Sequence, residues 1–316
     1  MKTVTEAAAW LRAHDNYLIL THRRPDGDAI GSAAALCLGL RSLGKEAELF
    51  PNTQFTEKYR SLWDGLVGSG DLAGKTLISV DLAAETMLPY NAEELAGQTV
   101  FCIDHHGSNS GYAQTSYVDA DAAACGELIW LTLQELGAPM TRRMADAIYV
   151  ALTTDTGCFR FSNTTGQTLR VAAACLEAGA DMTGWNRTLF MTRSKARLKL
   201  EAYLIQNAEF GADGKVCICT LPQAVLDEFG LSEDDIDDIS GYPRNIEGVE
   251  VGAVLRDVAD GTKISLRTFP PHDASAMCAR LGGGGHAAAA GATVKASLTE
   301  AKTALLAVFA EFGLEV

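Results

Sequence analysis

The sequence predicts a two-domain α/β protein, in which an N-terminal domain with a parallel sheet is joined by a helix to a smaller domain with a mixed sheet. Short apolar runs alternate with segments of helical periodicity up to about Leu189, the pattern of a parallel α/β domain. After Leu189 a hairpin-like pair of strands follows, flanked by helical segments. The length of 316 residues fits about two domains, and a hydrophobic content of 47% is enough for two cores.

In the N-terminal part, three apolar runs of strand length are separated by helical patterns. The expected strands are Tyr17–Leu20, Thr76–Val80 and Thr99–Ile103. Helices are expected over Ala33–Leu43 and Met144–Leu152. This order of elements favours βα units and therefore a parallel sheet.

The chain then changes character at a charged helical segment. Residues 191–207 contain RSKARLKLEAYLIQ, in which leucines and an isoleucine can pack while the charged residues stay in solvent. We interpret this range as a linker helix between domains 1–190 and 208–316. The strands and final helix expected in the second domain are Lys215–Leu221, Val249–Asp257, Thr262–Thr268 and Leu298–Phe312.

Aspartates and histidines cluster at the ends of several of these elements. Asp104, His105 and His106 follow one apolar strand and precede a glycine turn. The other clusters are His22, Asp26 and Asp28 after the first strand, Asp81 after the second, and Asp155 after the helix over Met144–Leu152. Taken singly, each aspartate could equally cap a helix or stand in a turn. Their recurrence on consecutive units favours a shared site at the carboxyl edge of the sheet.

The residue types in these clusters indicate metal chemistry. Carboxylate oxygens suit hard divalent cations, and imidazole shifts the preference toward transition metals, so the mixture suggests Mn²⁺. So many carboxylates could not lie close together without cations to offset their charge. Two metals about 3.5–4 Å apart can clamp a phosphoryl group and activate a water near neutral pH. Phosphate-ester hydrolysis is therefore the reaction that we expect.

A second motif lies near the C-terminus, where four glycines (Gly282–Gly285) precede His286. Glycines let backbone N–H groups wrap an anion without obstruction by side chains. The alanine-rich segment that follows, Ala287–Ala290, has the composition of a helix. A flexible linker is the alternative, but linkers seldom end in a histidine and an alanine-rich segment.

With these motifs in order, the whole chain resembles the DHH phosphoesterase superfamily with a DHH-associated C-terminal domain. The four N-terminal motifs correspond to HRRPDGDAIGS (His22–Ser32), VD (Val80–Asp81), DHH (Asp104–His106) and TDTGCF within Thr153–Phe159. The glycine run and histidine resemble the signature of the C-terminal domain. Within the superfamily, the layout is similar to the bacterial branch of bifunctional oligoribonucleases (nano-RNases) and 3′-phosphoadenosine-5′-phosphate (pAp) phosphatases.

The resemblance implies a role for each site residue. His22, Asp26 and Asp81 would bind one metal, and Asp28, Asp81, His105 and Asp155 the other, with Asp81 bridging. His106 would approach the scissile phosphate, and Asp104 would orient a histidine ring; both are our candidate catalytic residues. The residues expected to bind substrate phosphate are Arg267, Gly283, Gly284, Gly285 and His286. Two Mn²⁺ ions per site are expected as cofactors, with Mg²⁺ or Co²⁺ as alternatives.

The resemblance also implies the reaction, in which a hydroxide bound to both metals attacks the phosphate. Short oligoribonucleotides would yield nucleoside 5′-monophosphates, and pAp would yield AMP. A phosphodiesterase acting on cyclic or linear dinucleotides, such as c-di-AMP or pApA, is left open. A catalytically silent nucleotide-binding sensor is the alternative from a different class, although no expected metal ligand is missing.

Charge narrows the range of partners. The net charge of −14 argues against a protein that tracks long nucleic acid, because such proteins need a basic face. A local basic stretch exists at Arg187, Arg193, Lys195, Arg197 and Lys199. We therefore expect short RNA oligonucleotides or small nucleotides as substrates and no long nucleic acid as a partner. A homodimer is left open.

The remaining composition favours a cytoplasmic protein. There is no apolar stretch of 18 residues and no N-terminal secretion signal, so neither a membrane partner nor export is expected. The eight cysteines form no C-x-x-C pair. We expect them to be reduced and mostly buried.

Overall fold

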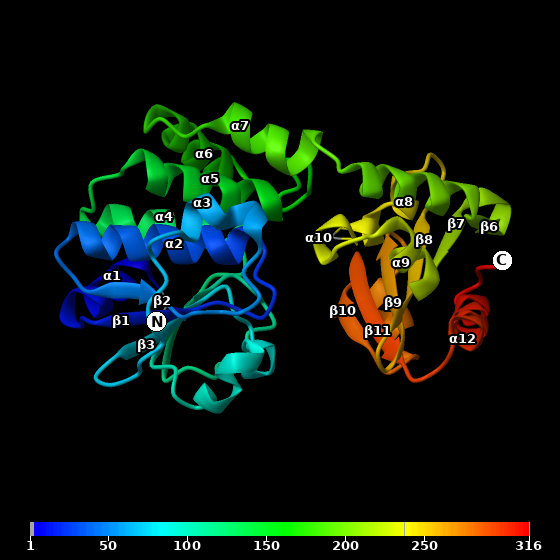
Figure 1. Cartoon of the computed structure of the whole chain (residues 1–316), viewed down its shortest axis with the longest axis horizontal. Coiled ribbons are helices and arrows are strands. Elements are labelled where there is room, and N and C mark those ends of the chain that lie inside the picture. The colour runs from blue at the N-terminus through cyan, green and yellow to red at the C-terminus, as the bar shows by residue number, and fades with distance from the viewer. Residues whose placement is uncertain (1–2, 237, 316) are drawn as a thin grey trace. The chain divides into compact units, whose positions relative to one another are not determined.

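The computed structural model describes residues 3–236 and 238–315. The chain divides into two units, Met1–Thr192 and Arg193–Val316 (Figure 1). The first contains a five-stranded parallel sheet and the second a six-stranded mixed sheet, so the predicted α/β fold class is confirmed.

The first sheet has the strand order β2-β1-β3-β4-β5. Its strands are β1 (Tyr17–Leu20), β2 (Ala47–Leu49), β3 (Thr76–Val80), β4 (Phe101–Asp104) and β5 (Thr115–Val118). Helices are α1 (Val4–Ala13), α2 (Gly27–Ser42), α3 (Arg60–Trp63), α4 (Cys125–Leu136), α5 (Arg142–Asp155), α6 (Gly166–Glu177) and α7 (Met182–Asn186). Short helical turns are η1 (Glu57–Tyr59), η2 (Glu85–Met87), η3 (Tyr90–Leu95) and the π-helical η4 (Arg187–Met191).

The two faces of this sheet are covered differently. Tyr17 and Ile19 point into the larger core with α1, α2, α4 and α5, and Figure 1 shows α2, α4 and α5 on one side of the sheet. Leu18 and Leu20 point into a smaller core that is closed by the segment containing η2 and η3. The alternation of residues along β1 thus serves both faces, which is why the strand is apolar throughout.

The second sheet has the order β10-β11-β9-β8-β7-β6. Its strands are β6 (Glu209–Gly211), β7 (Val216–Leu221), β8 (Val251–Val258), β9 (Gly261–Thr268), β10 (Gly284–His286) and β11 (Ala289–Val294). Helices are α8 (Lys195–Gln206), α9 (Gln223–Phe229), α10 (Glu233–Ile236), α11 (Ala274–Ala279) and α12 (Leu298–Glu311), with turns η5 (Ala212–Gly214), η6 (Ile239–Gly241) and η7 (Pro243–Asn245). Helix α8 lies within the range expected for the linker and groups with this second unit.

One expectation was wrong: the alanine-rich segment after the glycines is not a helix, because Ala287 and Ala288 form a turn and β11 begins at Ala289. Ala290 pairs with Leu266 of β9, and both side chains are buried in the core below the sheet. The antiparallel pairing with β9 supplies the backbone hydrogen bonds that a helix would otherwise make. Tertiary pairing therefore overrides the helical propensity of alanine.

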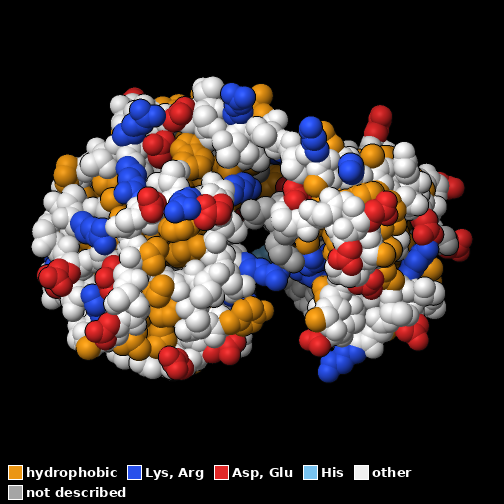
Figure 2. Space-filling view, in the orientation of Figure 1, with side chains coloured by type: hydrophobic (Ala, Val, Ile, Leu, Met, Phe, Trp, Pro, Cys, Tyr) orange, Lys and Arg blue, Asp and Glu red, His pale blue; other side chains and the backbone are white. Residues whose placement is uncertain are grey.

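Other features agree with the composition. Of the eight cysteines, all are free and seven are buried, with Cys158 partly exposed. Among the described residues, no helix is both long and apolar enough to cross a membrane. Figure 2 shows acidic and basic side chains interspersed over the visible face of each unit, so on that face the net charge is not gathered into one patch.

Candidate metal centre

The candidate residues gather at the carboxyl ends of neighbouring strands. β1 is followed by His22 and Asp26, β3 by Asp81, and β4 ends at Asp104, directly before His105. β2 and β3 lie on opposite sides of β1, so the winding of the chain reverses between β1 and β3. Parallel sheets bind ligands beyond their strand ends at such a switch point.

Asp28 and Asp155 come from helices and reach the same place through close helix packing. Asp28 lies in the first turn of α2, and Asp155 is the last residue of α5. A Cβ on Gly27 would lie 2.4 Å from the Thr154 side chain. One on Gly31 would lie 2.3 Å from a carbonyl oxygen of α5. The two glycines therefore let α2 and α5 approach until their carboxylates meet.

Three overlapping groups of ligand-type side chains result, in each of which the ligand atoms all lie within 4.8 Å of one another. The groups are His22, Asp26 and Asp81; Asp28, His105 and Asp155; and Asp81, His105 and His106. All six residues expected to bind metal are thus brought together. Asp81 belongs to two of the groups and His106, expected to contact substrate, joins the third.

Asp81 is held in an unusual way. Its φ of 52° lies in the left-handed region, although its backbone N–H continues the sheet by donating to Ile103. The residue is 2% exposed, and its Oδ1 accepts no hydrogen bond from the described residues. A strained backbone and an unsatisfied buried oxygen are costly unless the oxygen has another partner, such as a cation.

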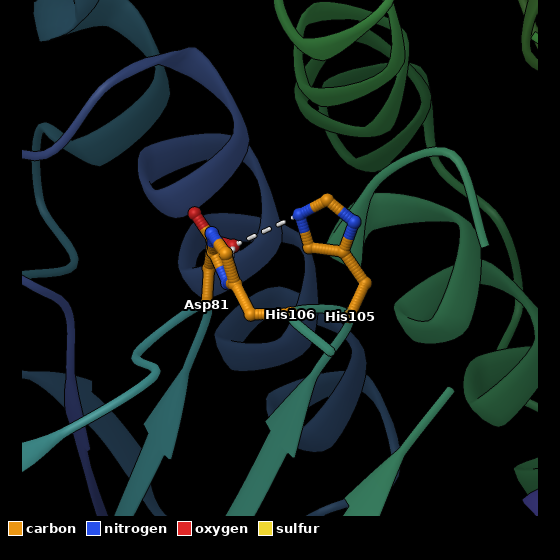
Figure 3. Close-up of side chains that lie close together, drawn as sticks. All are labelled: Asp81, His105 and His106. Carbon is orange, nitrogen blue, oxygen red and sulfur yellow. Dashed lines mark ion pairs between the residues drawn. The ribbon is translucent and has the colours of Figure 1, made fainter. Parts of the chain in front are cut away.

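The histidine rings are oriented by contacts at Nδ1. Nδ1 of His22 lies 2.7 Å from the Arg23 carbonyl oxygen, and Nδ1 of His105 lies 3.2 Å from that of Ala122. Each ring therefore directs Nε2 toward the carboxylates. A contact at one ring nitrogen orients the other nitrogen in the same way in histidines that bind metals. Figure 3 shows the Asp81 carboxylate beside the two histidine rings carried by the segment after β4.

Asp104 is tied to its own neighbours and does not join these groups. Its Oδ1 lies 2.7 Å from Nδ1 of His106 and also accepts from the backbone N–H of His105. Its Oδ2 accepts from Nδ2 of Asn109 at 2.6 Å. The carboxylate is fully buried, and these hydrogen bonds fix both the aspartate and the His106 ring.

The carboxylate of Asp28 is fixed by the start of a helix. Its oxygens accept from the backbone N–H groups of Cys125 and Gly126, the first residues of α4, and from the hydroxyl of Ser32. A helix N-terminus stabilises negative charge. Asp26 caps α2 through Oδ1, which accepts from the backbone of Asp28 and Ala29. Asp26 therefore both caps α2 and lies within one of the three groups.

The electrostatics of the cluster reflect this crowding. Burial, followed by the charge of Asp81, raises the pKa of Asp28 above its ordinary value. Burial and then the charge of Asp28 raise the pKa of Asp155. Burial lowers the pKa of His105, but the nearby carboxylates outweigh it and the net shift is upward. Without cations, the cluster thus favours extra protons.

The donor set fits divalent cations. The distances from histidine Nε2 to carboxylate oxygens range from 3.3 to 3.8 Å, too long for hydrogen bonds. They suit two ligands that share one ion at about 2.1 Å each. Cations would also supply the partner that Asp81 lacks and offset four carboxylates. Oxygen and imidazole ligands together suit Mn²⁺ or a similar ion.

The expected phosphate-binding residues lie in the second unit. Arg267 is on β9, Gly284 to His286 form β10, and Gly283 directly precedes that strand. In the sheet, Ala289 pairs with Arg267 on one side and with His286 on the other. Arg267 and His286 therefore occupy one row across three strands.

Sequence reasoning missed the residues that hold the ligands. Asn109 is close to the DHH tripeptide in sequence, and its amide could have been suspected for that reason. The backbone N–H groups of Cys125 and Gly126 carry no sequence signal, because any residue supplies them. Only the packing of α4 against α2 reveals their role.

Comparison with known proteins agrees with this geometry. The model of the DHH family N-terminal domain matches residues 16–152, and that of the DHHA1 domain matches residues 213–312. The bifunctional oligoribonuclease and PAP phosphatase NrnA of Thermus thermophilus is 34% identical over 281 residues, covering 88% of this chain and 83% of the relative. This chain belongs to the DHH family. The Bacillus subtilis protein of the same name is 26% identical over 297 residues, covering 92% of this chain and 93% of the relative.

Solved structures share the fold of this DHH-family chain. An exopolyphosphatase-related protein from Bacteroides fragilis superposes with a TM-score of 0.87 at 21% identity, covering 98% of this chain and 96% of that one. RecJ from Thermus thermophilus in complex with Mn²⁺ has a TM-score of 0.55 at 16% identity, covering 98% and 55%. Recognition of the family from its motifs is confirmed by the two domain matches and the Thermus thermophilus relative.

Proposed function

We propose that this chain is a metal-dependent phosphoesterase that hydrolyses short oligoribonucleotides to nucleoside 5′-monophosphates, pAp to AMP, or both. One observation carries the proposal: three Asp/His groups overlap at a switch point of the parallel sheet, and two of them share the buried Asp81. The relatives named as oligoribonuclease and PAP phosphatase support the substrate class. In this proposal the first unit carries out the reaction and the second binds substrate.

The residues that would hold two cations are His22, Asp26 and Asp81 for one, and Asp28, Asp81, His105 and Asp155 for the other. Mn²⁺ is the ion that we favour from the donor set, with Mg²⁺ or Co²⁺ as alternatives. Bound cations would supply Lewis-acid polarisation of the phosphoryl group and lower the pKa of water.

The chain's own residues would position the substrate and manage its charge. Asp104 engages Nδ1 of His106, so Nε2 is the ring atom available to a phosphoryl oxygen. We assign to His106 a hydrogen bond to that oxygen, strengthened as negative charge develops there. Asn109 and Asp104 act through His106 by holding its ring. A terminal phosphate would bind Arg267, His286 and the backbone of Gly283, Gly284 and Gly285.

Two further features support small substrates in a reducing compartment. A net charge of −14 disfavours long nucleic acid, since polymer binding depends on a basic face. Eight free cysteines are typical of a cytoplasmic protein.

The test is a product analysis with the purified chain and Mn²⁺. The panel contains pAp, pApA, a 5-mer RNA, a 24-mer RNA, c-di-AMP and pyrophosphate. We expect AMP from pAp and nucleoside 5′-monophosphates from pApA and the 5-mer, with little product from the 24-mer. Exclusive cleavage of c-di-AMP would replace this proposal with a dinucleotide phosphodiesterase, and no hydrolysis of any ester would leave a binding protein.

A further inference from the structure

Within the described residues of the second unit, no helix packs against half of one face of the second sheet. Buried residues such as Leu266 and Ala290 point toward α11 and α12. On the opposite face, α8, α9 and η7 lie against β7 and β8, and η6 against β8 and β9. The helix that contacts β10 and β11 is α11, on the first face. The exposed residues Lys263, Gly284 and His286 belong to the uncovered half.

Strand register aligns one row of residues across this open half-face. Gly252 of β8 pairs with Arg267 of β9, which pairs with Ala289 of β11, which pairs with His286 of β10. Directly opposed residues project from the same face of a sheet. Ala289 lies between Arg267 and His286 in this row. Because its side chain is small, the space above Ala289 is open.

At the other end of the row, a glycine admits a second arginine. A Cβ on Gly252 would lie 2.7 Å from the backbone N of Arg244, so only glycine lets η7 lie this close to β8. The guanidinium of Arg244 stacks on the ring of Phe269 at 4.9 Å from the centroid. Phe269 directly follows β9 and is 48% exposed, so much of this residue is in contact with solvent. The row thus begins with Arg244, beside Arg267.

The two guanidinium groups have few protein partners. Nε of Arg244 is buried and has no hydrogen-bond partner among the described residues. Nη1 of Arg267 donates to the Leu266 carbonyl oxygen, and within the described residues neither arginine forms an ion pair. Burial lowers the pKa of Arg267, and Arg244 adds to this, while Asp238 opposes it. Two adjacent cations with unused donors are an arrangement that an anion would complete.

We propose that Arg244 is a second phosphate-binding arginine and that it makes this face select a terminal phosphate monoester. The inference rests on the proposed function and deepens it by assigning the specificity of the second unit. A monoester presents three terminal oxygens and nearly two negative charges, whereas a diester presents two free oxygens and one charge. One arginine can bind two oxygens side by side, so a second arginine gives the third oxygen a charged donor.

Phe269 is the positioning residue for this arginine. Stacking holds the guanidinium plane above the ring and limits its rotation, so less entropy is lost when phosphate binds. Lysine at position 244 would keep the charge but lose both the flat stack and the paired donors.

The test measures binding in metal-free protein, so it does not depend on turnover. Calorimetry compares 5′-AMP with adenosine for the wild type, Arg244→Ala, Arg244→Lys and the control Arg280→Ala. Arg280 is an exposed arginine at the end of α11, on the opposite side of the sheet, paired with Glu311 at 3.4 Å. We expect Arg244→Ala to lose AMP affinity by about ten-fold or more, with adenosine unchanged. Arg244→Lys should lose less, and Arg280→Ala nothing.

The proposal is overturned if the wild type binds AMP no better than adenosine, or if both Arg244 variants bind AMP like the wild type. The melting temperature of each variant is measured alongside, and Arg244→Lys decides the question if Arg244→Ala does not fold. Steady-state kinetics on pApA and ApA then separate this proposal from the proposed function. A wild type that cleaves neither, while Arg244→Ala and Arg244→Lys still lose AMP affinity, refutes the function and keeps the phosphate assignment.

Discussion

The candidate metal centre and the proposed phosphate-binding face of the second sheet (Arg244, Arg267 and His286) have opposite electrostatic properties. The candidate metal centre concentrates carboxylates around Asp81; Asp28 and Asp81 are buried, Asp155 is partly exposed and Asp26 is exposed. The phosphate-binding face carries Arg244, Arg267 and His286 among exposed glycines and alanines, with few protein partners. The first has excess negative charge and a fixed geometry, which suits resident cations. The second has excess positive charge and open space, which suits an anion that must arrive and leave.

This contrast also explains where structural strain is found. The left-handed Asp81 directly follows β3, which is buried from Leu77 to Val80, so the surrounding sheet can enforce its backbone conformation. On the proposed phosphate-binding face, the positions with positive φ are glycines, Gly282 just before β10 and Gly285 within it. A side chain that binds a metal must be held in one position, so the fold tolerates a strained backbone at Asp81. A surface that contacts substrate only transiently can use glycines, which adopt positive φ without strain.

The largest effect is expected from removal of one proposed metal ligand. Asp155→Ala or His105→Ala should lower kcat by about a thousand-fold, since loss of metal-assisted charge stabilisation is worth several kcal/mol. The metal-free Asp155→Ala protein should melt at the same temperature as the wild type or higher, because a partly buried carboxylate crowded by other carboxylates is gone. Initial rates with Mn²⁺ and calorimetric melting curves measure both effects.

Asp64→Ala is the matched control for this experiment. Asp64 is an exposed aspartate of the same unit, at the end of α3 and outside the three ligand groups. It should keep wild-type kinetics. Substantial activity in Asp155→Ala or His105→Ala would remove the metal assignment, and a large drop in melting temperature would point to a structural role.

The sequence predicted the two regions unequally, for physical reasons. His22, Asp81 and the DHH tripeptide follow apolar strands, so their meeting at one sheet edge follows from local order alone. The role of Asn109 and the amides of α4 depends on how separate elements pack, which no local pattern encodes. The helix predicted at Ala290 is wrong because the pairing of Ala290 with β9 is a long-range contact that local composition does not encode. No local pattern marks Arg244, since Gly252 brings it to the sheet only in the folded chain.

The second prediction concerns how the stability of the metal-free protein and its Mn²⁺ affinity depend on pH. The raised pKa values of Asp28 and Asp155 mean that the folded metal-free protein retains protons which the unfolded chain loses above about pH 4. Its stability should therefore fall as pH rises toward those raised values. The raised pKa values of His22 and His105 act in the same direction above about pH 6.5. Cations must displace these protons, so Mn²⁺ affinity should rise by about ten-fold per pH unit for each proton released.

Calorimetric Mn²⁺ titrations at pH 6 and pH 7.5, in buffers with different ionisation enthalpies, count the released protons. Asp155→Ala should release fewer protons than the wild type. Equal Mn²⁺ affinity at both pH values would contradict the charged cluster as the cation site.

A smaller effect is expected from the contact that holds Asp104. In Asn109→Ala, Oδ2 of the buried Asp104 loses its 2.6 Å donor, so the His106 ring is less well fixed. We expect kcat to fall by about ten- to a hundred-fold, as for other contacts that orient a ligand, with KM nearly unchanged. Asn109→Asp should not rescue it, because a carboxylate cannot donate.

Asn91→Ala is the control, because Asn91 also donates a hydrogen bond from Nδ2, to the Pro51 carbonyl oxygen, outside the candidate site. It should leave kcat unchanged. If Asn109→Ala raised KM and spared kcat, Asn109 would act on substrate binding and the proposed positioning of His106 would be wrong.

The smallest expected effect tests whether the phosphate-binding face works through its backbone. A Cβ on Gly284 would meet nothing within 4 Å, whereas one on Gly283 would lie 2.2 Å from the Gly291 carbonyl oxygen. Gly283→Ala should therefore lower the melting temperature, and Gly284→Ala should not. Gly284 shares the exposed face of β10 with His286, so its added methyl should hold phosphate away from the backbone. KM for pApA should rise roughly two- to five-fold, equivalent to about 0.5 to 1 kcal/mol, with kcat unchanged. A wild-type KM in Gly284→Ala would mean that the phosphate does not contact the backbone of β10 and that the arginines bind it alone.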